Sequence, residues 1–378
     1  MKRVILIVAA LLILLTLTPV CAYADVMEDL DKEVSDNLGN IDFSEVDEAS
    51  GGFFKSVADK VKEIISGKYD GADTFMQLVA ALFSDGLRSV LPQLSAIFVV
   101  MVILGLIRKT TGGMISDGTN EVVSFVGVTV VLLSVLSMIV QAYKQAYELL
   151  EQVDTLAEAS APILLTLLIA NGGNAASSVC QPSMVMFSTV VIKTVSNAVL
   201  PLSVFSLAFS VVSNISSNIK VDKASSFLSN LSSWILGVLF MVYSAFTSVQ
   251  GISAVTLDGV SYRAAKFATR NYIPILGGYL ADGFDMVVAS TSLIKNAFGA
   301  VILLILLFAV AKPLMSTLCI NLGLQCVSAL CEPIVESKYI KMLSGISKNL
   351  TFLSVLILAV AFMFSILTLI VISCANGV

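Results

Sequence analysis

The stretch that decides the fold is residues 350–373, LTFLSVLILAVAFMFSILTLIVIS, which contain no charged side chain. A helix crosses the hydrocarbon core of a bilayer with about 20 mainly apolar residues. Similar apolar runs precede this one from about residue 90 onward. In the whole chain of 378 residues, 57% of side chains are apolar, 13% are charged, and mean hydropathy is +0.93. Because soluble domains carry about 25% charged residues, the composition predicts an all-α polytopic membrane protein.

The first 24 residues are typical of a signal peptide. Two basic residues precede an apolar run that ends at Pro19, and small residues at 22–24 match the spacing that signal peptidase recognises. An uncleaved first anchor helix is the alternative interpretation. Either way, we expect residues 25–88 to lie outside the cytoplasm.

The charge balance divides the remainder of the chain in two. Residues 25–88 hold fifteen acidic and six basic side chains, whereas residues 89–378 hold twelve acidic and fourteen basic ones. Apolar residues at helical spacing predict amphipathic helices over 53–65 and from about 73 to 83. We therefore expect an exported, acidic, partly helical N-terminal region followed by a multi-span domain. The amphipathic helices either form a small cap or offer a docking surface to a partner helix.

The apolar runs of the second part predict a bundle of six to eight transmembrane helices, with eight preferred. Residues 250–295 are difficult to place because they mix basic residues, Pro274 and two aspartates with apolar stretches. The clear candidates are 90–107, 122–140, 184–219, 227–249, 297–311, 314–331 and 350–373.

Charges and glycines between the runs predict the topology. Lys109, together with the arginine before it, follows the first span and is placed in the cytoplasm by the positive-inside rule. The acidic stretch 141–160 is then expected as an outward-facing loop. Residues 162–170 are too short for a span and predict a re-entrant or broken helix. Two further breaks are expected, a kink at Pro201 and a pivot at Lys312-Pro313.

Charged residues within apolar runs are candidate functional residues, since a charge at the bilayer centre costs about 2.5–3.5 kcal/mol on insertion scales. Lys193 lies deep in its run, while Asp282 and Asp285 share one face of any helix. The two aspartates are either an ion or proton site or ordinary acids in a re-entrant turn. We expect Lys295 and Lys312 to extend toward the headgroups from helix ends.

Small and polar residues recur every fourth position in two neighbouring runs, which places each set on one helical stripe. The stripes favour close helix packing through hydrogen bonds, and lining of a wet passage is the alternative. The first stripe is Ser206, Ser210, Asn214 and Asn218, and the second is Ser225, Ser229, Ser233 and Gly237.

The sequence offers little support for enzyme chemistry. It contains no histidine, which removes Ser-His-Asp triads and histidine-ligated zinc sites. It has no Cys-x-x-Cys pair, no metal-ligand spacing and no Walker A loop. An intramembrane aspartyl protease built on Asp282 and Asp285 lacks the Gly-x-Gly-Asp motif of that class. We therefore predict no catalytic, cofactor or metal site, and no nucleic-acid partner because there is no basic stripe.

One block of sequence resembles a known family. It reads GISAVTLDG at 251–259, RAAKF at 263–267 and PILGGYL at 274–280, followed by Asp282. These residues resemble the stage III sporulation protein AE family of endospore-forming bacteria, and the hydropathy pattern extends the resemblance over nearly the whole chain.

The resemblance implies a subunit of the channel or secretion-like complex that joins the mother cell to the forespore and sustains forespore gene expression. It implies a place in the mother-cell membrane around the forespore. The implied partners are other membrane subunits, ring-forming subunits and the ATPase of that complex. It supplies no catalytic residue.

A self-sufficient secondary transporter is the alternative function. Its support is a pair of Pro-led, Gly-Gly-containing apolar segments, 162–173 and 274–283, because interrupted helices in two halves of a chain are typical of transporter sites.

Overall fold

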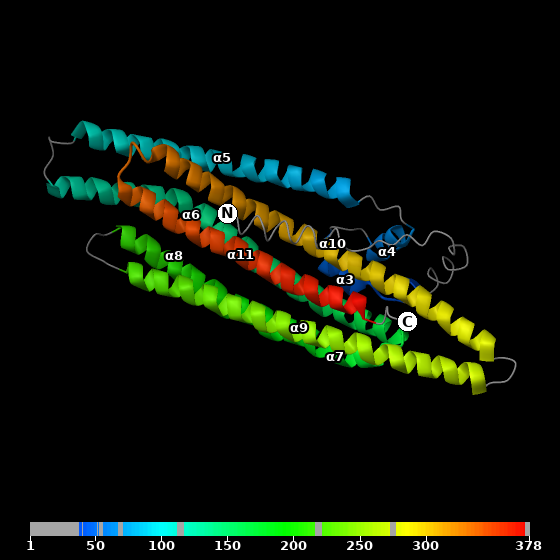
Figure 1. The fold of residues 1–378 in the computed structure, drawn as a ribbon. Coiled ribbons are helices and arrows are strands. Elements are labelled where there is room, and N and C mark those ends of the chain that lie inside the picture. The colour runs from blue at the N-terminus through cyan, green and yellow to red at the C-terminus, as the bar shows by residue number, and fades with distance from the viewer. Residues whose placement is uncertain are drawn as a thin grey trace.

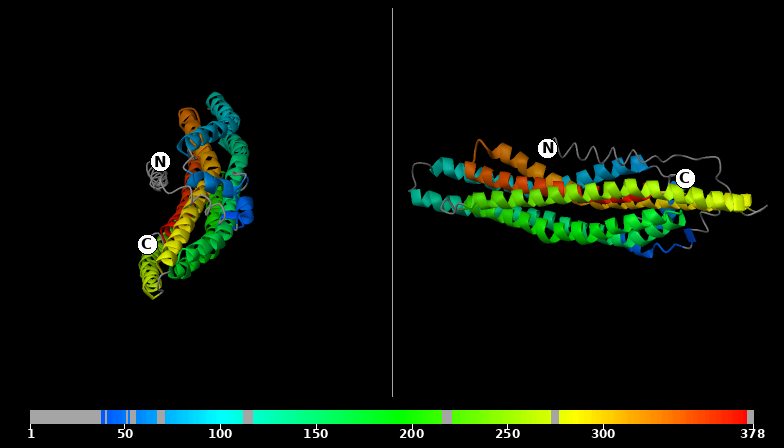
Figure 2. Two further views of the ribbon diagram at one scale, coloured as in Figure 1. Left: turned by 90° about the vertical axis from the view of Figure 1, so that its right-hand side faces the viewer. Right: turned by 60° about the horizontal axis from the view of Figure 1, so that its bottom comes forward.

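A computed structural model describes residues 38–39, 41–50, 52, 56–66, 71–111, 117–215, 221–272 and 277–374. Every regular element in this part of the chain is helical, and the long helices run side by side in an elongated bundle (Figures 1 and 2). The signal peptide predicted for residues 1–24 lies outside the described residues.

Six helical stretches in the described part are long and apolar enough to cross a membrane, which confirms the predicted polytopic all-α fold. Their number is at the lower end of the predicted range of six to eight. The stretches are Ala80–Ile107, Phe125–Ala170, Ala176–Ser213, Asp222–Gln250, Val287–Cys331 and Ser337–Ser373. The first begins within α5 (Gly71–Thr111), so one helix crosses the predicted domain boundary at residue 88.

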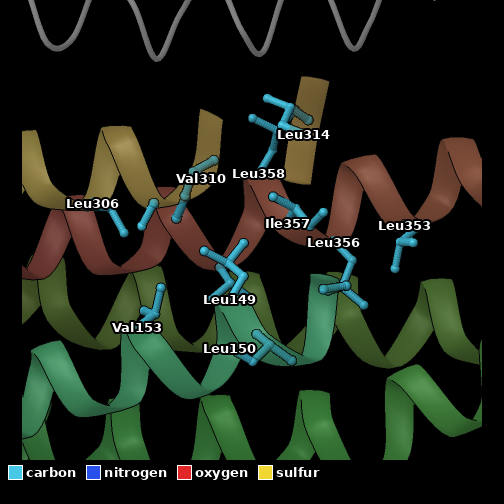
Figure 3. Packing of buried hydrophobic residues seen from close by; sticks show 14 of the residues in the cluster. Leu149, Leu150, Val153, Leu306, Val310, Leu314, Leu353, Leu356, Ile357 and Leu358 are labelled. Carbon is cyan, nitrogen blue, oxygen red and sulfur yellow. The ribbon is translucent and has the colours of Figure 1, made fainter. Parts of the chain in front are cut away.

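The predicted pivot at Lys312-Pro313 is wrong. A single helix, α10 (Gly277–Cys331), passes through Pro313 without interruption. Val310 and Leu314 on either side of the proline are buried in the same hydrophobic cluster as Ile357 of α11 (Ser337–Ser373) (Figure 3). This packing supports a continuous helix because a proline removes only one backbone donor, and neighbouring helices shield the freed carbonyl.

The predicted acidic loop over 141–160 and the broken helix at 162–170 are also wrong. Both belong to α6 (Asp117–Ala170), which continues through Pro162. Leu149, Leu150 and Val153 are buried in the core (Figure 3), whereas Glu148 and Glu151 are exposed. The stretch is therefore one amphipathic helix. The chain reverses after it at Gly172, whose φ of 79° is readily adopted only by glycine.

The kink expected at Pro201 appears instead as a π-helical region before the proline. The chain passes from α7 (Asn174–Met186) through π-helical segments at Phe187–Ile192 and Val195–Val199 into α8 (Leu200–Ile215). Proline cannot donate a backbone hydrogen bond, so the turn before it loses an α-helical partner and wider i→i+5 bonding becomes competitive.

The two ends of the bundle differ in charge, and short N-terminal helices pack on only one of them. We call the other the basic end. It holds the α5–α6, α8–α9 and α10–α11 connections (Figure 1). It carries Lys109, Lys223, Lys338 and Lys341. The opposite end, here the capped end, holds the α6–α7 turn and Cys374 at the end of α11. The short helices α3 (Ser44–Ala49) and α4 (Val57–Ile65) also lie there.

The N-terminal helices are part of the bundle core. Helix α3 packs on α6, and α4 packs on α10. The rings of Phe43 and Phe298 lie 5.4 Å apart between centroids. The Asp47 carboxylate accepts a hydrogen bond from the Val57 backbone N–H at 2.6 Å, which joins the two short helices. The described part of the amphipathic helix predicted over 53–65 thus forms a cap on α10.

Candidate functional site

An exposed apolar belt surrounds the half of the bundle next to the basic end. It is formed by large side chains of α5, α6, α8 and α9 (Asp222–Tyr272), among which Phe227, Trp234, Met241 and Val249 are each at least 65% exposed. Its members include Leu91, Val99, Ile103, Leu106, Val122, Val126, Leu133, Val140, Phe205, Phe209 and Phe227.

The height of the belt matches a bilayer. On α6 it runs from Val122 to Val140, or about 27 Å at 1.5 Å per residue. On α9 the described exposed side chains run from Phe227 to Val249, or about 33 Å by the same rise, and the side chains of 251–266 lie outside the described part. Toward the capped end α6 then presents exposed Lys144, Glu148 and other charged residues. A hydrocarbon core is about 30 Å thick, so the belt is a lipid-facing surface by both size and chemistry.

The two polar stripes meet at one reciprocal contact. The Ser206 hydroxyl donates to the Ser225 carbonyl at 2.9 Å, and the Ser225 hydroxyl donates to the Ser206 carbonyl at 2.8 Å. These bonds join α8 to α9 at the basic end. Each hydroxyl is bonded to backbone of the neighbouring helix, the kind of interhelical bond that membrane bundles use for association.

The other stripe residues point in different directions. Ser210 lies against Gly345 of α11, and Ser233 is exposed with its hydroxyl bonded to the Ser229 carbonyl. Gly237 is exposed, and a Cβ added to it would meet no atom within 4 Å. The Asn214 side chain and the whole of Asn218 lie outside the described part of the chain.

The three charged candidates are not brought together by any described contact. Lys193 is exposed between the two π-helical segments. Asp282 and Asp285 lie near the start of α10, but their side-chain surroundings are outside the described part.

The structure contains two polar contacts that the sequence did not indicate. The Ser188 hydroxyl in the first π-helical segment donates to Asp154 of α6 and lies 3.5 Å from a Glu158 carboxylate oxygen. Between α10 and α11, the Asn321 amide donates to Thr351 at 2.9 Å and its carbonyl oxygen accepts from Ser347. Gln325 bonds to the same Asn321 oxygen and to Ser347, each at 3.0 Å.

Lys295 also departs from its prediction. It does not extend toward the headgroups but is 0% exposed, and its ammonium donates to the backbone carbonyl of Cys374. The Cys180 and Cys374 sulfurs lie 3.9 Å apart beside it. Lys312, by contrast, is exposed, but it lies in the interior of the continuous helix α10 and not at the helix end that was expected. No local pattern reveals this cluster because its three residues come from α7, α10 and the end of α11.

Comparison with known proteins decides the family. The family model of stage III sporulation protein AE matches residues 55–375. The chain belongs to the stage III sporulation protein AE family. A curated relative, stage III sporulation protein AE of Bacillus subtilis (strain 168), is 27% identical over 317 residues, covering 83% of this chain and 79% of that protein. No solved structure matches the chain significantly.

The family match confirms the resemblance drawn from residues 251–282 and extends over all six candidate spans. This member of the sporulation protein AE family is therefore a multi-pass membrane protein involved in sporulation. The quoted residues 251–267 lie near the end of α9, and 277–282 begin α10. These two helix ends extend beyond the rest of the bundle at the capped end (Figure 1).

Proposed function

We propose that this chain is a non-enzymatic membrane subunit of the channel or secretion-like complex between mother cell and forespore. It sits in the mother-cell membrane around the forespore. Its basic end faces the mother-cell cytoplasm, where the ATPase of the complex binds. Its capped end faces the space between the two membranes, where ring-forming subunits are met.

The proposed orientation is supported by charge and by span number. Lys109 and Lys341 are exposed at the basic end, and cytoplasmic ends of membrane bundles carry the excess of lysine and arginine. Six spans are an even number, so the α3–α4 cap and Cys374 fall on the same side. That side is the one to which a signal peptide would deliver residues 25–88.

The position of the apolar belt supports a bundle in which the half next to the capped end projects from the membrane. Helix α6 has 54 residues and is about 81 Å long at 1.5 Å per residue, more than twice the thickness of a hydrocarbon core. If the belt marks the bilayer, the acidic face of α6 and the α3–α4 cap stand clear of the lipid. Exposed Glu148, Glu151 and Glu158 then lie where soluble partner domains reach them.

The proposal rests on the hydrogen-bond partners of three described polar side chains, which all lie on neighbouring helices of the same bundle. Ser206 bonds to α9, Ser188 bonds to α6, and Asn321 bonds to α11. Each contact holds two helices of the bundle together. Such contacts are those of a scaffold that presents surfaces to other subunits.

The transporter alternative loses half of its sequence support. Residues 162–170 are the last turns of the continuous helix α6 and not an interrupted membrane helix. In the second segment, 277–283 are the first turns of α10, while 274–276 lie outside the described residues. A matching pair of broken segments therefore no longer favours this function.

Co-purification tests the proposal. The full-length chain, carrying a C-terminal affinity tag, is extracted from sporulating cells in mild detergent. We expect several other membrane proteins and an ATPase to be recovered with it, since a conduit subunit works in an assembly. Recovery of the chain alone from cells that sporulate normally would contradict the proposal.

A double substitution separates the function classes. Asp282→Asn together with Asp285→Asn should leave spore yield nearly unchanged, because a scaffold needs no ionisable carboxylate there. A proton-coupled transporter or an aspartyl protease would lose function. Chain abundance in the membrane fraction is the control, so that a folding defect is not mistaken for a chemical one.

A further inference from the structure

Two cysteines distant in the sequence meet at the capped end. Cys180 lies in the second turn of α7, and Cys374 directly follows α11, 194 residues later. Their sulfurs are 3.9 Å apart, and the side chains are 2% and 0% exposed. The turn between α6 and α7 and the end of α11 are thus held against each other by two thiols.

A buried ammonium completes the cluster. Lys295 of α10 is fully buried and donates a hydrogen bond to the Cys374 carbonyl, which places its ammonium beside the two cysteines. A neighbouring positive charge favours the thiolate form of cysteine, which is the nucleophile in disulfide exchange. The close approach of Gly299 and Ile372 brings α10 and α11 together at the same level.

We propose that Cys180 and Cys374 become joined by a disulfide after the capped end has been exported. This inference rests on the proposed orientation, because disulfides form and persist outside the reducing cytoplasm. A disulfide has a sulfur–sulfur bond of about 2.05 Å, so the two atoms must approach by about 1.9 Å. Cys374 directly follows α11 with an extended backbone, φ −67° and ψ 143°, so it can move without unwinding the helix.

The oxidant is the disulfide of an exported thiol–disulfide oxidoreductase. Before the end of α11 packs against α7, the accessible Cys374 thiolate attacks one sulfur of that disulfide, which forms a mixed disulfide and releases the other oxidoreductase sulfur as a thiolate. The Cys180 thiolate then attacks the Cys374 sulfur and displaces the second oxidoreductase thiolate. The chain loses two protons and two electrons, and the oxidoreductase is reduced to its dithiol.

Differential labelling of the full-length chain tests the proposal. Sporulating cells are quenched in acid, remaining thiols are blocked with N-ethylmaleimide in denaturant, and disulfides are reduced. The newly exposed thiols are then labelled with polyethylene-glycol maleimide. We expect the wild-type chain to gain two labels after reduction, and Cys180→Ser and Cys374→Ser to gain none. Cys326→Ser, which removes an exposed cysteine of α10, is the matched control and should still gain two.

A wild-type chain that gains no label after reduction overturns the proposal. A tag at the C-terminus, probed by protease added to the outer face, tells whether the orientation has failed as well. Cleavage of the tag without a disulfide leaves the orientation intact and refutes the disulfide alone. Protection of the tag refutes both.

Discussion

A close approach of a helix glycine to the backbone of a turn at the basic end gives a direct test of the packing. Gly105 of α5 lies against the α10–α11 turn, and a Cβ placed on it would be 2.7 Å from both the carbonyl oxygen and the Cγ2 atom of Ile334. The backbone oxygen cannot rotate out of the way as a side chain does. We therefore expect Gly105→Ala to push α5 away from the turn.

The matched variant is Gly237→Ala on α9, where an added Cβ meets no atom within 4 Å. Both substitutions place alanine in a helix interior, which favours the folded helix by up to about 1 kcal/mol. This contribution is common to the two variants, so the difference between them isolates the clash. Inserting a methyl group into a packed contact costs about 1–3 kcal/mol, and we expect the free energies of unfolding of the two variants to differ by about that amount.

The assay is unfolding of the full-length chain by sodium dodecyl sulfate in dodecylmaltoside micelles, followed by near-ultraviolet circular dichroism. Tryptophan fluorescence is unsuitable because the only tryptophan, Trp234, lies one turn from Gly237. Gly105→Ala should lower the detergent midpoint relative to wild type, and Gly237→Ala should leave it equal or higher. Equal midpoints for the two variants would refute the close approach of α5 to the α10–α11 turn.

Three further predictions use the same chain. Ser225→Ala should destabilise the bundle by about 0.6 kcal/mol, the mean for an interhelical hydrogen bond in a membrane. Ser233→Ala, the control, should leave the stability unchanged. Equal detergent midpoints for the two variants would contradict the α8–α9 contact. Asn321→Ala should cost about 1–3 kcal/mol because three polar partners lose their bond, and a midpoint equal to wild type would exclude that network. Lys109→Glu combined with Lys341→Glu should yield chains of mixed orientation, seen as partial protection of a C-terminal tag from external protease. The corresponding arginine pair should retain full cleavage, and full cleavage of the glutamate pair would contradict the assignment of the basic end.

Hydropathy was sufficient to predict the fold class but not the length of the helices. A run of four acidic residues over 148–158 interrupts an apolar pattern and therefore predicted a loop. In the structure these acids occupy one face of α6, while Leu149, Val153 and Leu156 recur on the other and are buried. An average of hydropathy along the sequence combines the two faces of the helix and hides this 3.6-residue period. Proline caused a similar error, since Pro313 is a helix breaker only where packing does not compensate for its missing donor.

The polar contacts between helices were the least predictable feature. The Ser206–Ser225 pair was within reach of sequence reasoning because both residues lie on four-residue repeats in neighbouring runs. The repeat does not give the face that each residue presents, however: positions four apart drift around a helix of 3.6 residues per turn, and Ser233 and Gly237 are exposed. The cluster of Cys180, Lys295 and Cys374 has no periodic signal, because its members are separated by more than 70 residues and meet only through tertiary packing.

The long helices carry apolar residues for two different reasons. In the apolar 18-residue stretches that mark the candidate spans of α5 and α9, 28% and 22% of residues are buried, whereas in those of α10 and α11 the shares are 72% and 61%. The apolar residues of α5 and α9 therefore face outward, as a lipid-facing surface requires. Those of α10 and α11 fill the interior of the bundle, where dense packing against other helices selects the same side chains.

The distinction between lipid-facing and core-forming apolar residues also applies to the most apolar stretch in the chain. Residues 350–373 are long enough to cross a bilayer, yet Leu353, Leu356 and Phe364 of that stretch are at most 2% exposed. Helix α11 runs to the capped end of the bundle (Figure 1) and packs against α10, α9 and α8. The apolar character of this stretch is therefore explained by packing in the protein core, without a need for lipid contact. A charged substitution at Leu356 should accordingly destabilise the bundle through loss of packing, even where no lipid touches it.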